Sequence, residues 1–405
     1  MRAFHEKGTQ MAFVPLDVFA DRAERIRAYL DEQGLEALIV NTAGNVFMLS
    51  GWHLDVEPWE RPVAIVIPKL GEPFMVLNEL STNHLKMAEE RGTLYIRDYS
   101  IYAEHPRTRN RTYTRGQWAQ LLEIRLKERG IVKGKIGVEG YGPTDLLKAN
   151  PAFGFVNVTP FLIEMRQVKY PVEIEIMREC AALTDYGQDR YMELLKPGEN
   201  VLAFDSRIFA LIYEEAARRF PEDRFEARGF SLSGPASAAP HGTGANVGTV
   251  FEKGHGIVNI IVCRLSGLVV ESERTLFLGE PSDLQKRAFN AATEASEAAA
   301  AQMVKGNRVS SADEAAQAVY EAAGFGDNIN HRTGHGVGII GHEYPEDMPF
   351  LHRPFYENEV YSSEPGIYIY GVGGFRQDDT VVVGATAPEV LNKRSKKLED
   401  QIFPV

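Results

Sequence analysis

The chain has 405 residues and a net charge of −12, with 44% hydrophobic and 25% charged residues. This is the composition of a globular protein, and the length indicates two or three domains. The acidic balance argues against a nucleic-acid-binding protein, whose surface would be basic. Only two cysteines occur, and no apolar run approaches the ~20 residues needed to cross a bilayer. We therefore expect a cytoplasmic protein that binds neither nucleic acid nor membrane.

The first part of the chain alternates between helical and extended patterns. Apolar spacing over 17–33 predicts a helix, Gly34 ends it, and the apolar stretch 35–40 follows as a buried strand. The remaining elements expected here are strands at 62–68, 73–77 and 135–140 and a helix at 116–129. This alternation predicts an α/β domain over residues 1–165.

Residues 166–405 are expected to form a second domain. A long helical pattern covers 165–195, with Pro171 near the helix start, and a second covers 204–219. The pattern of two helices separated by a Lys-Gly break returns at 283–304 and 312–324, roughly 108 residues later. We expect an internal duplication whose copies build one α+β domain. Two helix pairs that are alike by chance are the alternative.

Four polar clusters lie in this second domain, each beside apolar, β-prone sequence. They contain His241; Asn259, Glu271 and Glu273; His331, His335 and His342; and Glu364, Arg376 and Asp378.

The two glutamates of the second cluster are the most informative of these residues. Glu271 and Glu273 are two apart on a predicted strand, so their side chains point to the same face. On a solvated edge this would mean little, but apolar residues flank them and indicate a central strand. A buried carboxylate pair requires a cation, a proton or hydrogen bonds.

Three stretches resemble the histidine and glutamate motifs of the pita-bread superfamily, which includes methionine aminopeptidase, aminopeptidase P, prolidase and creatinase. They are TGHGVGIIGH (333–342), SSEPGIYI (362–369) and GFRQDDTVVV (374–383). The N-terminal half is similar to the smaller domain of creatinase and prolidase. The resemblance implies an α+β fold, in which a smaller α/β domain precedes a pita-bread domain with an internally duplicated, curved antiparallel sheet covered by helices.

Metal-dependent members of this superfamily use the ligands Asp, Asp, His, Glu and Glu. The resemblance matches these to Asn259, Glu271, His335, Glu364 and Asp378, so three of the five differ. An asparagine cannot supply the anionic oxygens that bridge two hard cations. These differences predict that the protein uses no metal and no other cofactor, with a weak single-ion site as the alternative.

Two further stretches resemble the metal-independent creatinase branch. SGPASAAPH (233–241) carries a histidine at the creatinase spacing after Ser-Gly, and SERTLFLG (272–279) carries a glutamate directly before Arg-Thr-Leu. The resemblance implies that His241, Glu273 and Glu364 are catalytic. Arg61 matches an arginine that reaches into the partner's site in creatinase, which implies a homodimer.

The resulting prediction is a hydrolase that cleaves a C–N bond of a small guanidino or amidino compound without metal. His241 would be the general acid and base, and Glu273 and Glu364 would bind the cationic centre. The expected substrate-binding residues are Arg61, Asn259, Glu271, His335, His342 and Asp378.

Two alternatives stay open. The first is a metal-dependent Xaa-Pro peptidase, or a lyase of the same fold. It is favoured by the sequence of residues 335–345, which is more similar to the peptidases than to creatinase. A catalytically silent binding protein is the other alternative, although such a protein would not need His241, Glu273 and Glu364 together.

Overall fold

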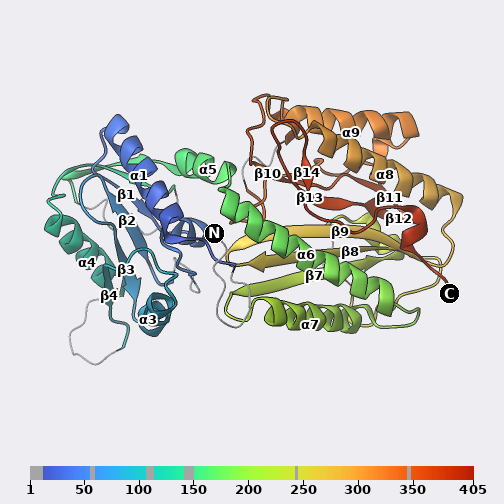
Figure 1. Ribbon diagram of the computed structural model, residues 1–405, viewed down its shortest axis with the longest axis horizontal. Helices are drawn as coiled ribbons and strands as arrows, with labels where there is room; N and C mark the ends of the chain where they lie inside the picture. Colours follow the sequence, from blue (N-terminus) through green and yellow to red (C-terminus); the bar gives the residue numbers. More distant parts are fainter. Residues whose placement is uncertain (1–11, 55–59, 106–113, 141–149, 242–244, 344–347) are drawn as a thin grey trace. The chain divides into compact units, whose positions relative to one another are not determined.

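The computed structural model describes residues 12–54, 60–105, 114–140, 150–241, 245–343 and 348–405 (Figure 1). The chain divides into two compact units, one of residues 13–165 and one that contains residues 166–405. Among the described residues, no helix combines the length and the apolar character that crossing a bilayer requires.

The unit of residues 13–165 is built on a six-stranded sheet of order β4-β3-β2-β1-β5-β6. Its central strand β1 pairs antiparallel with β2 and parallel with β5, so the sheet is mixed. The strands are β1 (Ala37–Val40), β2 (Ala64–Pro68), β3 (Phe74–Asn78), β4 (Tyr99–Tyr102), β5 (Gly134–Val138) and β6 (Phe153–Asn157). The helices are α1 (Leu16–Gln33), α2 (Ala43–Ser50), α3 (Ser81–Arg91), α4 (Thr114–Glu128) and α5 (Thr159–Gln167), which contains the unit boundary.

Helix α1 shows how the sequence pattern sets an element. Phe19, Ile26 and Leu30 recur at helical spacing and are almost fully buried. Gly34 ends the helix with φ +63°, a left-handed conformation that a residue with a side chain rarely adopts. The predicted helix and its end are confirmed.

The unit that contains residues 166–405 is built on a larger sheet of order β10-β13-β9-β8-β7, in which neighbouring strands run antiparallel. Strand β9 lies in the middle, as the apolar residues around Glu271 and Glu273 predict. The strands are β7 (Phe225–Ser233), β8 (Gly256–Leu265), β9 (Leu268–Leu278), β10 (Val360–Ser363) and β13 (Asp378–Val382), with β14 (Glu389–Val390) on β13 and β15 (Ile402–Phe403) on β9.

Two helix pairs cover this sheet, one toward β7 and one toward β10 (Figure 1). Helix α6 (Pro171–Leu194) packs on β8 and β9, and α7 (Val201–Arg219) packs on β7. Toward β10, α8 (Asp283–Gln302) packs on α9 (Ser310–Ala323) and on the small sheet of β11 (Gly366–Ile369) and β12 (Gly373–Arg376). The predicted fold class is therefore confirmed.

The two faces of the large sheet have different neighbours, and the site depends on this difference. Thr275 of β9 exchanges two hydrogen bonds with the backbone of Arg376 on β12, at 2.9 and 2.8 Å. Ser272 of the same strand instead accepts from Gln188 of α6. We call the side toward β12 the site face and the side toward α6 the helix face.

Candidate functional site

Three acidic side chains point from the large sheet to its site face. Glu271 and Glu273 alternate along β9 with residues of the helix face, as the strand pleat requires. Asp378 of β13 lies directly opposite Glu273 in the strand register. Their exposed fractions are 8%, 5% and 0%, so three carboxyl groups share a nearly dry environment.

His335 and Glu364 are brought to the same place by a chain segment that runs beside β10. The amide of Ser362 donates to His335 O and the amide of Glu364 donates to Thr333 O, both at 2.8 Å. Gly334 permits this approach, because a Cβ there would lie 2.0 Å from Ser362 O. As a result, His335 Nε2 lies 3.2 Å from Glu271 Oε1 and 3.5 Å from Glu364 Oε1. We call Glu271, Glu273, His335, Glu364 and Asp378 the site cluster.

The imidazole of His335 presents an unprotonated nitrogen to these carboxylates. Its Nδ1 lies 3.0 Å from Gly336 O, and that contact requires Nδ1 to carry the proton. Burial lowers the pKa of His335 to about 4, so the ring is neutral at pH 7. The lone pair of Nε2 therefore faces the carboxyl groups of Glu271 and Glu364, where it can accept a proton from Glu271 or bind a cation.

Burial and neighbouring charges also shift the pKa values of the acids in the site cluster. Burial, and then the neighbouring carboxylates, raise the pKa of Glu271 and of Asp378 well above the ordinary values. Burial also raises the pKa of Glu273 to about 8, although Arg376 acts against it. Burial alone would raise the pKa of Glu364 too, but His335 and Arg376 outweigh it and lower that pKa.

The donor atoms fit divalent cations. Glu271, His335 and His342 each offer a ligand atom within 4.8 Å of the other two, and so do Glu273, Glu364 and Asp378. Glu271 Oε1 and Asp378 Oδ2 are buried and accept no hydrogen bond from the described residues. Carboxylate oxygens and neutral imidazole nitrogens are the ligands that Zn²⁺, Mn²⁺ and related ions prefer.

Asn259 lies elsewhere, and its predicted place beside Glu271 needs correction. It pairs with Arg274 in the register of β8 and β9, whereas Glu271 pairs with Val262. Its side chain points to the helix face, where Nδ2 donates to Gln188 Oε1 at 2.7 Å. Asn259 and Glu271 are thus on opposite faces of the sheet.

The remaining predicted residues differ in their relation to the site cluster. The ring of His342 lies 4.0 Å from that of His335 and is exposed. His241 is also exposed, with its ring 6.4 Å from that of His331. Arg61 belongs to the unit of residues 13–165, where its Nε lies 2.9 Å from a carboxylate oxygen of Glu104.

The predicted site omits three residues that the structure places beside the cluster. Arg376 forms an ion pair with Glu273, its Nη2 donating to Oε1 at 2.9 Å. Tyr368 Oη lies 3.4 Å from Arg376 Nη1 and 2.6 Å from His331 Nε2. Both His331 and Arg376 stand in the polar clusters of the sequence, so their position is a usable signal. Tyr368 is part of the β-prone stretch of β11 and gives no such signal.

Comparisons with known proteins cover nearly the whole chain. Residues 22–168 match the creatinase/prolidase N-terminal domain, and residues 175–385 match metallopeptidase family M24. A putative dipeptidase, YkvY of Bacillus subtilis, is 29% identical over 93% of this chain and 99% of its own length. An Xaa-Pro dipeptidase of Pyrococcus horikoshii is 23% identical over 95% and 100%. The crystal structure of dipeptidase PepE from Mycobacterium ulcerans has a TM-score of 0.79, with 26% identity over 97% of this chain and 100% of that one.

These findings confirm the superfamily but not the branch. The prediction of a metal-independent amidinohydrolase of the creatinase type is wrong, because the matched family is one of metallopeptidases and both curated relatives are named as dipeptidases. What stands is a hydrolase of the broader group. Because the matched region covers more than half of its residues, the chain belongs to metallopeptidase family M24.

Proposed function

We propose that this chain is a metal-dependent dipeptidase, with Xaa-Pro dipeptides as the first substrates to test. The observation that carries the proposal is His335 Nε2, an unprotonated nitrogen 3.2 Å and 3.5 Å from two buried carboxylate oxygens. The names of the relatives from Bacillus subtilis and Pyrococcus horikoshii support a dipeptide as the substrate class.

Glu271, His335, Glu364 and Asp378 are the residues that would hold the metal. A divalent ion at such a place makes water a stronger nucleophile at neutral pH and polarises a carbonyl group, which together lower a barrier by several kcal/mol. The backbone carbonyl of Gly336 contributes by fixing the His335 tautomer.

The histidines beside the site cluster would handle protons. His331 is held from both sides, because Nδ1 lies 2.7 Å from Arg332 O and Nε2 lies 2.6 Å from Tyr368 Oη. Burial lowers the pKa of His331, so it remains neutral and positions Tyr368. His241 is exposed near His331, so it is the better candidate to donate a proton to the amine that leaves when a peptide bond breaks.

The test is hydrolysis of dipeptides by purified protein before and after treatment with a chelator. Gly-Pro, Ala-Pro, Ala-Ala and the tripeptide Ala-Pro-Ala separate a dipeptidase with proline specificity, a general dipeptidase and an aminopeptidase P. We expect turnover of at least one dipeptide, a loss of more than about 100-fold on chelation, and recovery with Mn²⁺, Co²⁺ or Zn²⁺.

Glu357→Gln is a suitable control, because Glu357 is an exposed acid whose ion-pair partner, Lys305, is also exposed. Its turnover and metal dependence should equal those of the parent protein. Turnover that survives complete removal of metal would contradict the proposal, and so would failure to hydrolyse any of these peptides with metal supplied. A homodimer with Arg61 at the partner's site, and a cytoplasmic location, stay predictions.

A further inference from the structure

Strand β8 carries no ligand on the site face, although every one of its residues is described. The side chains that point there from its middle are Val258, Ile260 and Val262, since these pair with Thr275, Glu273 and Glu271 of β9. Ile260 is 7% exposed and packs with Leu232 and Val258. The superfamily resemblance calls for a second aspartate about a dozen residues before Glu271, and Ile260 occupies the place where such a side chain would face the cluster.

Glu273 lies directly opposite Ile260 in the strand register. Side chains of directly opposed residues begin only about 5 Å apart, and a glutamate has one more methylene than an aspartate with which to reach across. Its carboxylate offers an oxygen within 4.8 Å of ligand atoms of Glu364 and Asp378. Asp378 Oδ2 in this group is fully buried and accepts no hydrogen bond from the described residues, so this oxygen is available to a cation.

We propose that Glu273 replaces the missing β8 carboxylate, so that the chain retains two cation positions with one ligand moved to the opposite strand. One position is formed by Glu271, His335 and His342, and the other by Glu273, Glu364 and Asp378. This inference rests on the proposed metal dependence. The site cluster then has four carboxylates, the same number as the ligand set of the metal-dependent superfamily members, although β8 supplies none of them.

Arg376 decides between this proposal and its main rival. The guanidinium pairs with Glu273 and also reaches Tyr368 Oη and Pro240 O, each at 3.4 Å. Arg376 contacts both oxygens of Glu273, Oε2 through Nε and Oε1 through Nη2. A carboxylate has about four lone-pair sites, so these contacts fix the orientation of Glu273 and still leave lone pairs for a cation. In the rival arrangement the guanidinium itself takes the place of the second ion, and the protein binds a single one.

The experiment is a titration of chelator-treated protein with Mn²⁺ by calorimetry, with bound metal measured by mass spectrometry after desalting. We expect about two ions per chain for the parent protein and about one for Glu273→Gln, with the weaker site losing at least about 10–100-fold in affinity. Circular dichroism and the thermal midpoint establish that each variant is folded.

A matched pair of double variants tests the relocation itself. Ile260→Asp combined with Glu273→Gln returns a carboxylate to the site face of β8 and should restore the second ion. Asn259→Asp combined with Glu273→Gln places the same carboxylate one residue away, on the helix face, and should not.

Three outcomes overturn the inference while leaving a metal-dependent dipeptidase intact. They are one ion in the parent protein, two ions in Glu273→Gln, or an Ile260→Asp/Glu273→Gln protein that folds but does not regain the lost ion. A parent protein that binds no metal at all would instead remove the proposed function, on which the inference rests.

Discussion

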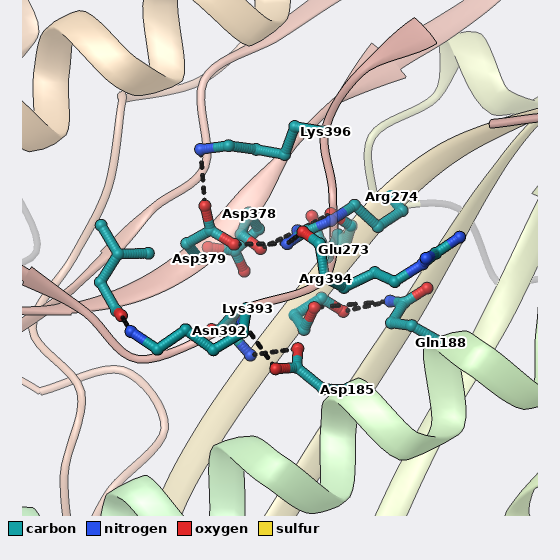
Figure 2. Close-up of polar contacts among 12 residues, drawn as sticks. Asp185, Gln188, Glu273, Arg274, Asp378, Asp379, Asn392, Lys393, Arg394 and Lys396 are labelled. Atoms are coloured by element: carbon teal, nitrogen blue, oxygen red, sulfur yellow. Dashed lines mark hydrogen bonds and ion pairs between the residues drawn. The ribbon is translucent and has the colours of Figure 1, made fainter. Parts of the chain in front are cut away.

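Asp378 and Asp379 are neighbours on β13, equally buried, and point to opposite faces of one sheet. On the helix face, Asp379 receives Arg274 Nη2 at 2.6 Å and Lys396 Nζ at 2.7 Å (Figure 2). Burial alone would raise the pKa of Asp379, but these two cations outweigh it and lower that pKa. On the site face, Asp378 receives a hydrogen bond from Ser362 at 2.8 Å, and its pKa is raised well above the ordinary value.

The difference separates an acid that stabilises the fold from one that is available to a ligand. A buried carboxylate paired by two cations holds strands and loops together, whereas an unpaired one costs stability until something binds to it. The helix face continues the satisfied pattern, with Asn259 between Gln188 and the backbone amide of Arg274. On the site face, by contrast, Glu271 Oε1 accepts no hydrogen bond from any residue that the structure describes.

The strongest way to test this contrast is Asp378→Asn. It removes a proposed metal ligand, so we expect kcat/KM for the best dipeptide to fall more than about 100-fold. It also removes a buried carboxyl group whose ionised form is disfavoured by burial, so the thermal midpoint measured with chelator should stay the same or rise. Full activity in this variant would contradict the assignment of metal binding to the site face and of fold stability to the helix face.

The complementary change, Asp379→Asn, should act on stability instead. It leaves the fully buried guanidinium of Arg274 without its carboxylate. We expect the free energy of unfolding, measured with urea, to fall by about 3–5 kcal/mol. Metal content per folded molecule should equal that of the parent protein, and a variant that loses metal but not stability would reverse the roles given to the two aspartates.

The pH dependence of the chelated protein sharpens the same comparison. The pKa of Glu273 is about 8 in the folded protein, against 4.5 ordinarily, so the folded state holds its proton more tightly. Stability from this group is complete below the ordinary pKa and is lost as pH rises through about 8. Urea denaturation at pH 6 and pH 9 should therefore show a loss, with a slope of up to about 1.4 kcal/mol per pH unit for one proton.

Saturating Mn²⁺ should remove most of this slope, because bound cations compensate the ionised carboxylates. Glu273→Gln should reduce the slope without metal. An unchanged slope in both cases would place the titrating group elsewhere.

Lys396→Met should give the smallest effect. Lys396 is partly exposed, and Arg274 still neutralises Asp379 after the change. We expect the free energy of unfolding to fall by no more than about 1 kcal/mol. Lys305→Met is the matched control, because Lys305 and its partner Glu357 are both exposed, and it should have no measurable effect.

Much of the fold could be predicted from the sequence, because long elements carry repeated signals. Helices α1 and α6 show apolar spacing, and Pro171 occupies the first position of α6, where its missing amide proton is not needed. The short helices α2 and α3 are not predicted. Helix α2 has only eight residues, most of them buried, so no polar face alternates with an apolar one.

The candidate site was harder to predict for two reasons. Asn259 and Ile260 are adjacent, and a shift of one residue in the register moves a side chain to the other face of the sheet. A ligand matched one position too early therefore fell on the helix face. The sequence motif also predicts the wrong functional branch, because the glutamate before Arg274 resembles creatinase, whereas similarity over the whole chain favours peptidases. A short motif does not distinguish a carboxylate that binds a substrate cation from one that binds an ion.

Arg274 also donates from the helix face to the main-chain carbonyl of Asp378, at 2.7 Å. The backbone of Asp378 is thereby held by a fully buried side chain on the helix face. This contact does not depend on whether a metal ion is bound on the site face. Loading and emptying the protein should then leave β13 in place, so crystals of the stripped form ought to accept ions by soaking without cracking. Inhibitors could accordingly be designed against one fixed geometry rather than a family of shapes.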